Sequence, residues 1–138
     1  RRYHHHHHQF VGSVNLLQLP ESLEILSLCR NSFSGTLDLS NLPVTLERLY
    51  LNENKFQGNI ELQRFPMNMK HLILADNDFD GTVRIGIVPP TLVEMNIDKN
   101  SKLDKLVIEG VHRLGRKGSI QEQIYTAFPQ LTASGGIY

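Results

Sequence analysis

Apolar and polar residues alternate in short runs along this chain, and the runs recur every 23 residues. In each run two apolar residues flank a variable one, as in Leu26-Ser27-Leu28 and Leu49-Tyr50-Leu51. Alternation with a period of two predicts a β-strand that buries one of its faces. We therefore predict one short strand in every 23-residue unit, with the leucines facing a shared core.

Further columns of residues keep the same phase and define a complete repeat unit. They are Asn31, Asn54, Asn77 and Asn100; Phe33, Phe56 and Phe79; Gly35, Gly58 and Gly81; and Pro43, Pro66 and Pro89. Repeat units of this length cannot bury their apolar face alone, so they stack on one another. We expect the asparagine to end the strand and to bond to backbone groups that burial would otherwise leave unpaired. The phenylalanines are expected to stack beneath that turn.

The second half of the unit alternates again, for example in Thr36-Leu37-Asp38-Leu39 and Thr82-Val83-Arg84-Ile85. This pattern predicts a short extended segment on the far side of each coil, not a helix. The phase also runs backward to Phe10, so that the repeat begins with a half-coil followed by four copies. The fourth copy diverges, because Lys102 and Asp104 replace the phenylalanine and the glycine.

The unit L-x-x-L-x-L-x-x-N-x-F-x-G resembles the leucine-rich repeat motif over residues 10–111. The resemblance implies an α/β-type, right-handed solenoid with a parallel sheet on its concave side. The alternating second halves predict a convex side of mostly extended segments with little helix. The repeat differs from the plant receptor type, in which Ile-Pro directly follows the glycine region. The resemblance also implies that the protein is a binding module, since most proteins of this class are.

Residues 1–9 form a histidine-rich segment that contains the run His4 to His8. This run has two interpretations: the remnant of an affinity tag, or a degenerate native coil. A run of imidazoles can bind divalent metal. A specific metal site would need carboxylate or thiolate partners, and none is evident, so no metal site is predicted.

Residues 112–138 follow the repeats and are predicted to form a C-terminal cap with a mobile tail. Ser119 and Glu122 have the spacing of a capping box, and the helix that they start ends at Pro129. The apolar face of this helix is expected to cover the last coil; the alternative is that it docks on a partner.

The charge balance and the length of the apolar runs bear on which partners the chain can bind. The chain has 14 basic and 14 acidic residues, so its net charge gives no general attraction to nucleic acid, and no nucleic-acid partner is predicted. No apolar run reaches the ~20 residues that cross a bilayer, so no membrane insertion is expected.

Cys29 is the single cysteine, and none of the ten asparagines lies in an N-x-[ST] sequon. Both features favour an intracellular, reducing compartment.

Motifs of enzymes are missing from the sequence. It has no glycine-rich phosphate loop, no G-x-S-x-G, no H-E-x-x-H and no cysteine set for a metal. We predict no catalytic residue and no cofactor, and we interpret Cys29 as an unreactive surface thiol.

The outward positions of the concave strands are free to vary and are the predicted binding site. Tyr50 and Ile73 form an apolar centre with polar neighbours, which is typical of interface hot spots. The predicted binding residues are Arg48, Tyr50, Asn52, His71, Ile73, Asp76 and Asn96. Two charge pairs between neighbouring coils, Arg30 with Glu53 and Asp76 with Lys99, are expected to neutralise each other.

The predicted function is that of an interaction or scaffold module that binds another protein, as one subunit of a larger assembly. The alternative is a recognition protein at the cell surface or outside the cell. The sequence does not indicate the partner or the oligomeric state.

Overall fold

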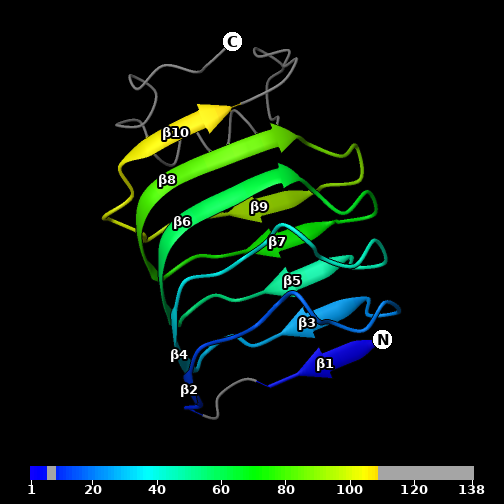
Figure 1. Ribbon diagram of the computed structural model, residues 1–138, viewed down its shortest axis with the longest axis horizontal. Coiled ribbons are helices and arrows are strands. Elements are labelled where there is room, and N and C mark those ends of the chain that lie inside the picture. The colour runs from blue at the N-terminus through cyan, green and yellow to red at the C-terminus, as the bar shows by residue number, and fades with distance from the viewer. Residues whose placement is uncertain (6–8, 109–138) are drawn as a thin grey trace.

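The computed structural model describes residues 1–5 and 9–108 of this 138-residue chain. These residues form a parallel β-solenoid of about five coils, and each coil contributes one strand to each of two sheets (Figure 1). The first sheet has the strand order β1-β3-β5-β7-β9, and the second has the order β2-β4-β6-β8-β10. Neighbouring strands in both sheets are parallel. The predicted repeat solenoid is thereby confirmed.

The two sheets differ in the length of their strands. The first sheet has three-residue strands: β1 (Arg2–His4), β3 (Ile25–Ser27), β5 (Arg48–Tyr50), β7 (His71–Ile73) and β9 (Glu94–Asn96). The second sheet comprises β2 (Val11–Gly12), β4 (Ser32–Gly35), β6 (Lys55–Arg64), β8 (Asp78–Ile87) and β10 (Lys105–Ile108). The extended segments predicted for the far side of the coils lie in strands β6 and β8 in the third and fourth coils, whereas Thr36 to Leu39 of the second coil follow β4 outside any strand.

No helix occurs within residues 1–5 and 9–108, so this part of the chain is built from strands and turns alone. The α/β character that the resemblance implied does not appear there. The C-terminal helix predicted from Ser119 lies outside the described residues.

Residues 1–5 at the start of the histidine-rich segment take part in the solenoid. β1 pairs with β3, so that Tyr3 lies beside Leu26, and the His5 amide donates to the Ser27 carbonyl at 2.7 Å. The first coil consequently has a strand in both sheets, where the sequence had predicted a half-coil beginning at Phe10.

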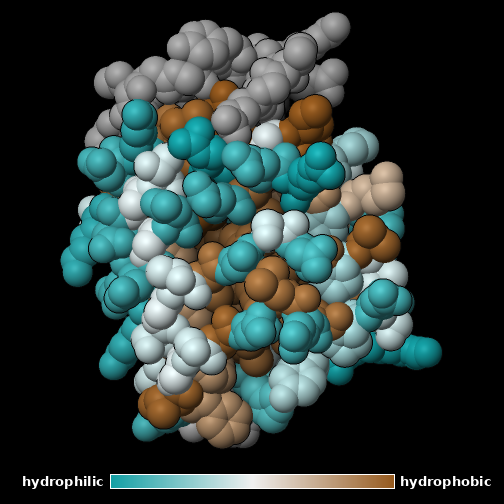
Figure 2. Space-filling view, in the orientation of Figure 1, coloured by the Kyte–Doolittle hydropathy of each residue, from teal (hydrophilic) through white to brown (hydrophobic). Residues whose placement is uncertain are grey.

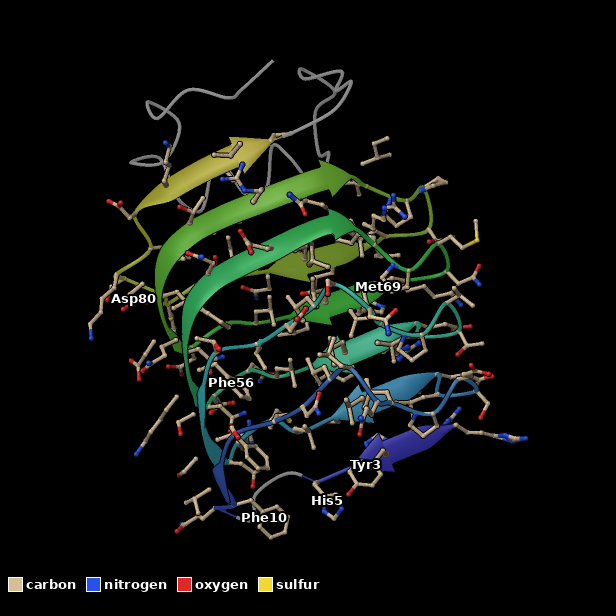
Figure 3. All side chains as sticks on the ribbon, viewed as in Figure 1. Tyr3, His5, Phe10, Phe56, Met69 and Asp80 are labelled. Atoms are coloured by element: carbon tan, nitrogen blue, oxygen red, sulfur yellow. The ribbon has the colours of Figure 1, made fainter. Side chains whose placement is uncertain are left out.

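The leucine and phenylalanine columns fill the space between the two sheets. Leu49, Leu72, Phe56 and Phe79 have no exposed surface. The rings of Phe33 and Phe56 stack with their centroids 6.4 Å apart and an interplanar angle of 13°. Figure 3 shows Phe10 and Phe56 along the side where the first sheet turns into the second, with Met69 at the opposite end of the sheets. The predicted phenylalanine column is present, and it closes this side of the core.

The buried asparagines form a ladder of hydrogen bonds between coils. The side-chain amide nitrogen of Asn54 donates to the Leu28 carbonyl of the preceding coil at 2.9 Å and to the Leu51 carbonyl of its own coil at 3.2 Å. Its side-chain oxygen accepts from the Phe33 amide at 3.1 Å. Asn31, Asn77 and Asn100 make the equivalent bonds. The predicted structural role of this column is confirmed in its geometry.

A second ladder runs along the proline corner at the other end of the sheets. The Thr45 hydroxyl donates to the Leu23 carbonyl of the preceding coil at 2.7 Å, and the Thr91 hydroxyl donates to the Met69 carbonyl at 2.8 Å. Each corner also has a turn in which the proline carbonyl accepts a backbone bond, as from the Leu46 amide to Pro43 at 3.0 Å. The two ladders hold both ends of the first sheet in register.

The second sheet is continuous only in the later coils, and one column of residues explains why. In the first two coils, Asn15 and Asp38 accept a hydrogen bond from the amide two residues later, each at 2.9 Å. Such Asx turns bend the backbone away from a strand. The next two residues of the column are Glu61 and Arg84, and their longer side chains form an ion pair across β6 and β8 at 3.7 Å. The strands therefore continue in the third and fourth coils and stop early in the first two.

Hydrogen bonds from Ser40 lower the pKa of Asp38, first through the Ser40 hydroxyl and second through its amide. Because these bonds favour the ionised carboxylate, their contribution to stability is fully present above the ordinary pKa of an aspartate and is lost as the pH falls through the lowered value.

Replacing Asn54 by Ala should lower the free energy of unfolding by about 2–3 kcal/mol, because it leaves buried backbone groups of two coils without partners. Urea unfolding followed by circular dichroism measures this loss. The control is Asn41→Ala at an exposed position, where we expect a change within about 0.5 kcal/mol. Equal effects of both substitutions would contradict the ladder.

The Asp38 turn predicts a pH titration of the Ser40 amide proton, measured by NMR. The midpoint should lie below the ordinary pKa of an aspartate carboxyl, because ionised Asp38 accepts the Ser40 hydrogen bonds. Asp38→Asn keeps an acceptor at this position, as Asn15 does, and should abolish the titration. A midpoint at or above the ordinary value would contradict the hydrogen-bonded carboxylate.

Candidate functional site

The outward face of the first sheet brings five of the seven predicted binding residues together. Inward Leu49, Leu72 and Met95 are buried, so their neighbours in the three-residue strands point out of the sheet. The pairing of β5, β7 and β9 places Arg48, His71 and Glu94 in one row across the strands. It places Tyr50, Ile73 and Asn96 in a second row. We call these two rows the β5–β9 face.

The β5–β9 face has an apolar centre with a polar border. Tyr50 and Ile73 are half-buried neighbours, which leaves parts of both side chains accessible. Beside them the His71 Nδ1 lies 3.3 Å from the Glu94 carboxylate, and Arg48 is exposed at the end of the same row. An accessible aromatic and aliphatic pair flanked by charges of both signs can bury apolar surface on contact and can fix orientation through its border.

The other two predicted residues lie beyond the ends of these strands. Asn52 follows β5, and its amide donates to the neighbouring Glu53 carboxylate at 3.4 Å. Asp76 lies in the turn before Asn77 with a φ of 58°. Both positions belong to the turn that leads to the second sheet and not to the two rows.

Two features near the face were missed in the prediction. Glu94 contacts His71 and belongs to the first row. Lys70 pairs with Glu47 of the preceding coil at 3.2 Å, directly before strands β7 and β5 begin. Both pairs join residues 23 positions apart, so the repeat phase could have found them.

The residue before each asparagine of the ladder adopts a left-handed backbone conformation, and none of these residues is glycine. Arg30, Glu53, Asp76 and Lys99 have φ values of 57° to 58°. For a residue with a Cβ this conformation costs about 1–2 kcal/mol. The sequence signal was absent, since glycine is the usual marker of such a position.

The predicted neutralisation between coils holds for one of the two charge pairs. Arg30 Nε lies 2.9 Å from the Glu53 carboxylate, and this hydrogen bond raises the pKa of Arg30. Asp76 and Lys99 are both described, and no ion pair joins them. Both groups of the Arg30 pair are exposed, so its contribution to stability is small.

In the second coil Ser27 aligns with Tyr50, and Cys29 aligns with Asn52 beyond the end of the strand. Ser27 is 5% exposed, and its hydroxyl lies 3.4 Å from the Cys29 thiol, which is itself half-buried. These small side chains leave less accessible surface than Tyr50 and Ile73 do, so the face is centred on the later coils.

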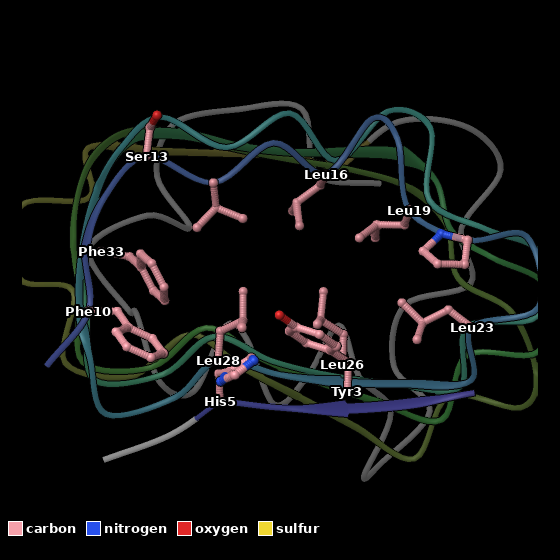
Figure 4. A pocket seen from close by; sticks show the side chains of 12 residues that line it. Tyr3, His5, Phe10, Ser13, Leu16, Leu19, Leu23, Leu26, Leu28 and Phe33 are labelled. Carbon is pink, nitrogen blue, oxygen red and sulfur yellow. The ribbon is translucent and has the colours of Figure 1, made fainter. Parts of the chain in front are cut away.

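A cavity of about 610 Å³ opens at the N-terminal end of the core (Figure 4). Leucines of the core columns line it, together with Tyr3, His5 and Phe10, whose rings contact each other edge to face. It is the continuation of the core between the two sheets of the first coil, and its lining follows the repeat columns.

In the described ranges, no group of three or more His, Cys, Asp or Glu side chains is placed to hold a metal ion. Within the same ranges, no helix has the length and apolar character needed to cross a membrane.

No protein-family model matches the chain, and neither the curated proteins nor the solved structures yield a match to it.

Replacing Asp76 by Gly should raise the free energy of unfolding by about 0.5–1 kcal/mol, because glycine relieves the left-handed strain and loses only part of this gain as chain entropy. Urea unfolding measures the change. The matched control, Asp78→Gly at the start of β8, should lower stability by about 0.5–1 kcal/mol. Equal destabilisation by both substitutions would contradict this prediction, because it would mean that the Asp76 side chain stabilises the fold by more than the left-handed conformation costs.

Proposed function

We propose that this chain is a leucine-rich-repeat-type module that binds another protein through the β5–β9 face, as one member of a larger assembly. The assignment to this repeat type is supported by the period of 23 residues, by the parallel first sheet and by the asparagine ladder. The second sheet distinguishes these coils from repeats in which a helix covers the far side.

The observation that carries the binding proposal is the register of three strands. Tyr50, Ile73 and Asn96 project from adjacent strands and form one continuous row with the charged row beside it. The same residues scattered over a surface would not be a site, but here the pairing of β5, β7 and β9 places them side by side. Because strand pairing already orders this backbone, binding does not have to order it, which lowers the entropy cost of association.

Partner capture followed by one substitution tests this proposal. Chemical crosslinking and mass spectrometry in extract from the native source should link Lys70 or Lys99 to a reproducible partner protein, because these exposed lysines border the face. With that partner purified, Tyr50→Ala should weaken binding by about tenfold or more, as truncation of a hot-spot tyrosine does.

The control for Tyr50→Ala is Ile87→Ala, which removes an apolar side chain that is 70% exposed at the end of β8 in the other sheet. We expect Ile87→Ala to leave the affinity unchanged. Both variants should keep their free energy of unfolding within about 1 kcal/mol of the parent protein. Unchanged affinity of Tyr50→Ala, or an equal loss in both variants, would place the binding surface elsewhere.

A further inference from the structure

The backbone beneath the β5–β9 face is already paired within the first sheet. β5 pairs with β3 on one side and with β7 on the other, and β7 pairs with β5 and β9. A partner that lies on β5 and β7 therefore contacts side chains and not a strand edge. An extended peptide buried against them would leave its own backbone groups without partners, whereas an α-helix satisfies these groups internally. The strand pairing thus favours a helical partner segment.

The dimensions of the first sheet also suit a helix. The sheet has five strands side by side, but each strand has three residues and presents only two outward ones (Figure 1). Neighbouring strands lie about 4.8 Å apart, and successive turns of an α-helix lie about 5.4 Å apart. A helix that crosses β5, β7 and β9 can therefore place one turn against each strand. Residues on one side of an extended peptide are about 6.7 Å apart and would fall out of step with the strands.

The charged row of the β5–β9 face changes sign from one end to the other. Arg48 on β5 is exposed and joins none of the ion pairs among the described residues. Glu94 on β9 lies beside His71 but keeps 48% of its side chain exposed. Lys70 and Glu47 precede the row and pair with each other at 3.2 Å, so they leave this order unchanged. The face therefore offers a cation at β5 and an anion at β9.

The outward side of β6 and β8 differs from the β5–β9 face. Between their buried residues these strands expose hydrophilic side chains such as Glu61, Asp78 and Asp80. Figure 2 shows hydrophilic side chains over these two strands. A helix placed there would lack an apolar pair such as Tyr50 and Ile73 on which to bury its own apolar side. The first sheet is therefore the better platform for an amphipathic helix.

We propose that the β5–β9 face binds one amphipathic α-helix of the partner protein, which crosses β5, β7 and β9 with an acidic residue against Arg48 and a basic residue against Glu94. The two charged residues of the helix lie seven positions apart, because seven residues rise about 10.5 Å and two strand intervals measure about 9.6 Å. Apolar residues at the third and fourth positions between them pack on Tyr50 and Ile73. This inference rests on the proposed function and adds the class of the partner segment.

A library of helices tests this arrangement without the natural partner. The probe is a stable two-helix hairpin displayed on phage, in which positions i, i+3, i+4 and i+7 on the exposed side of one helix are randomised. Selection on the immobilised full chain should enrich one acidic and one basic residue at the two end positions. It should enrich apolar residues at the two middle positions.

Charge reversal shows which residue of the face contacts each end of the helix. Selection on Arg48→Glu should enrich a basic residue at the end position where the parent protein enriches an acidic one. Hairpins selected on the parent protein should bind Arg48→Glu at least about tenfold more weakly, because two acidic residues then face each other. The matched control is Arg64→Glu, at an exposed position at the end of β6, which should leave both the affinity and the selected pattern unchanged.

Three results would overturn the charge-ordered helix: selection that enriches no hairpin, enrichment without opposite charges at the two ends, or equal binding to the parent protein and to Arg48→Glu. Tyr50→Ala separates this test from that of the proposed function. Hairpins that lose affinity for Tyr50→Ala but bind Arg48→Glu normally would overturn the charge order and leave the β5–β9 face as a protein-binding surface. Hairpins that bind Tyr50→Ala like the parent protein would overturn both.

Discussion

The solenoid depends on the hydrogen bonding of backbone groups that its own stacking buries. At the end of each first-sheet strand the chain turns inside the molecule, and the carbonyls there have no strand partner of their own. The asparagine amide reaches one carbonyl in its own coil and one in the preceding coil, while its oxygen accepts from a third backbone group. Because Asn31, Asn54, Asn77 and Asn100 repeat this bond at the same place in four successive coils, the period of 23 residues is fixed, and with it the alignment of the other columns.

That alignment has different results in the two sheets. In the first sheet all strands have the same length, so outward residues form straight rows, and sequence variation alone decides what each row can bind. In the second sheet the strand length changes from coil to coil, because Asn15 and Asp38 make turns where Glu61 and Arg84 extend. Successive coils of the first sheet thus differ only in their outward side chains, whereas successive coils of the second sheet also differ in the length of their strands.

The repeat phase predicted the solenoid, the inward columns and the rows that hold Tyr50 and Ile73, because burial requires apolar residues and leaves a plain mark in the sequence. It did not predict the second sheet, whose pairing depends on whether a short or a long polar side chain follows Leu37 or Ile60. It also missed the left-handed residue before each asparagine, because charged residues such as Glu53 stand where glycine is usual. The corner ladder was missed because Thr45, Asn68 and Thr91 share only their hydrogen-bonding capacity.

The asparagine ladder also has a direction. Each side-chain amide donates to a carbonyl of the coil before it, as Asn54 does to Leu28 and Asn77 does to Leu51. Each coil therefore carries the side-chain donor that joins it to the coil before it. A coil without its predecessor would keep the bonds of its asparagine within the coil but would lose the bond to the preceding carbonyl, so the ladder is complete only where a coil stacks on the one before it.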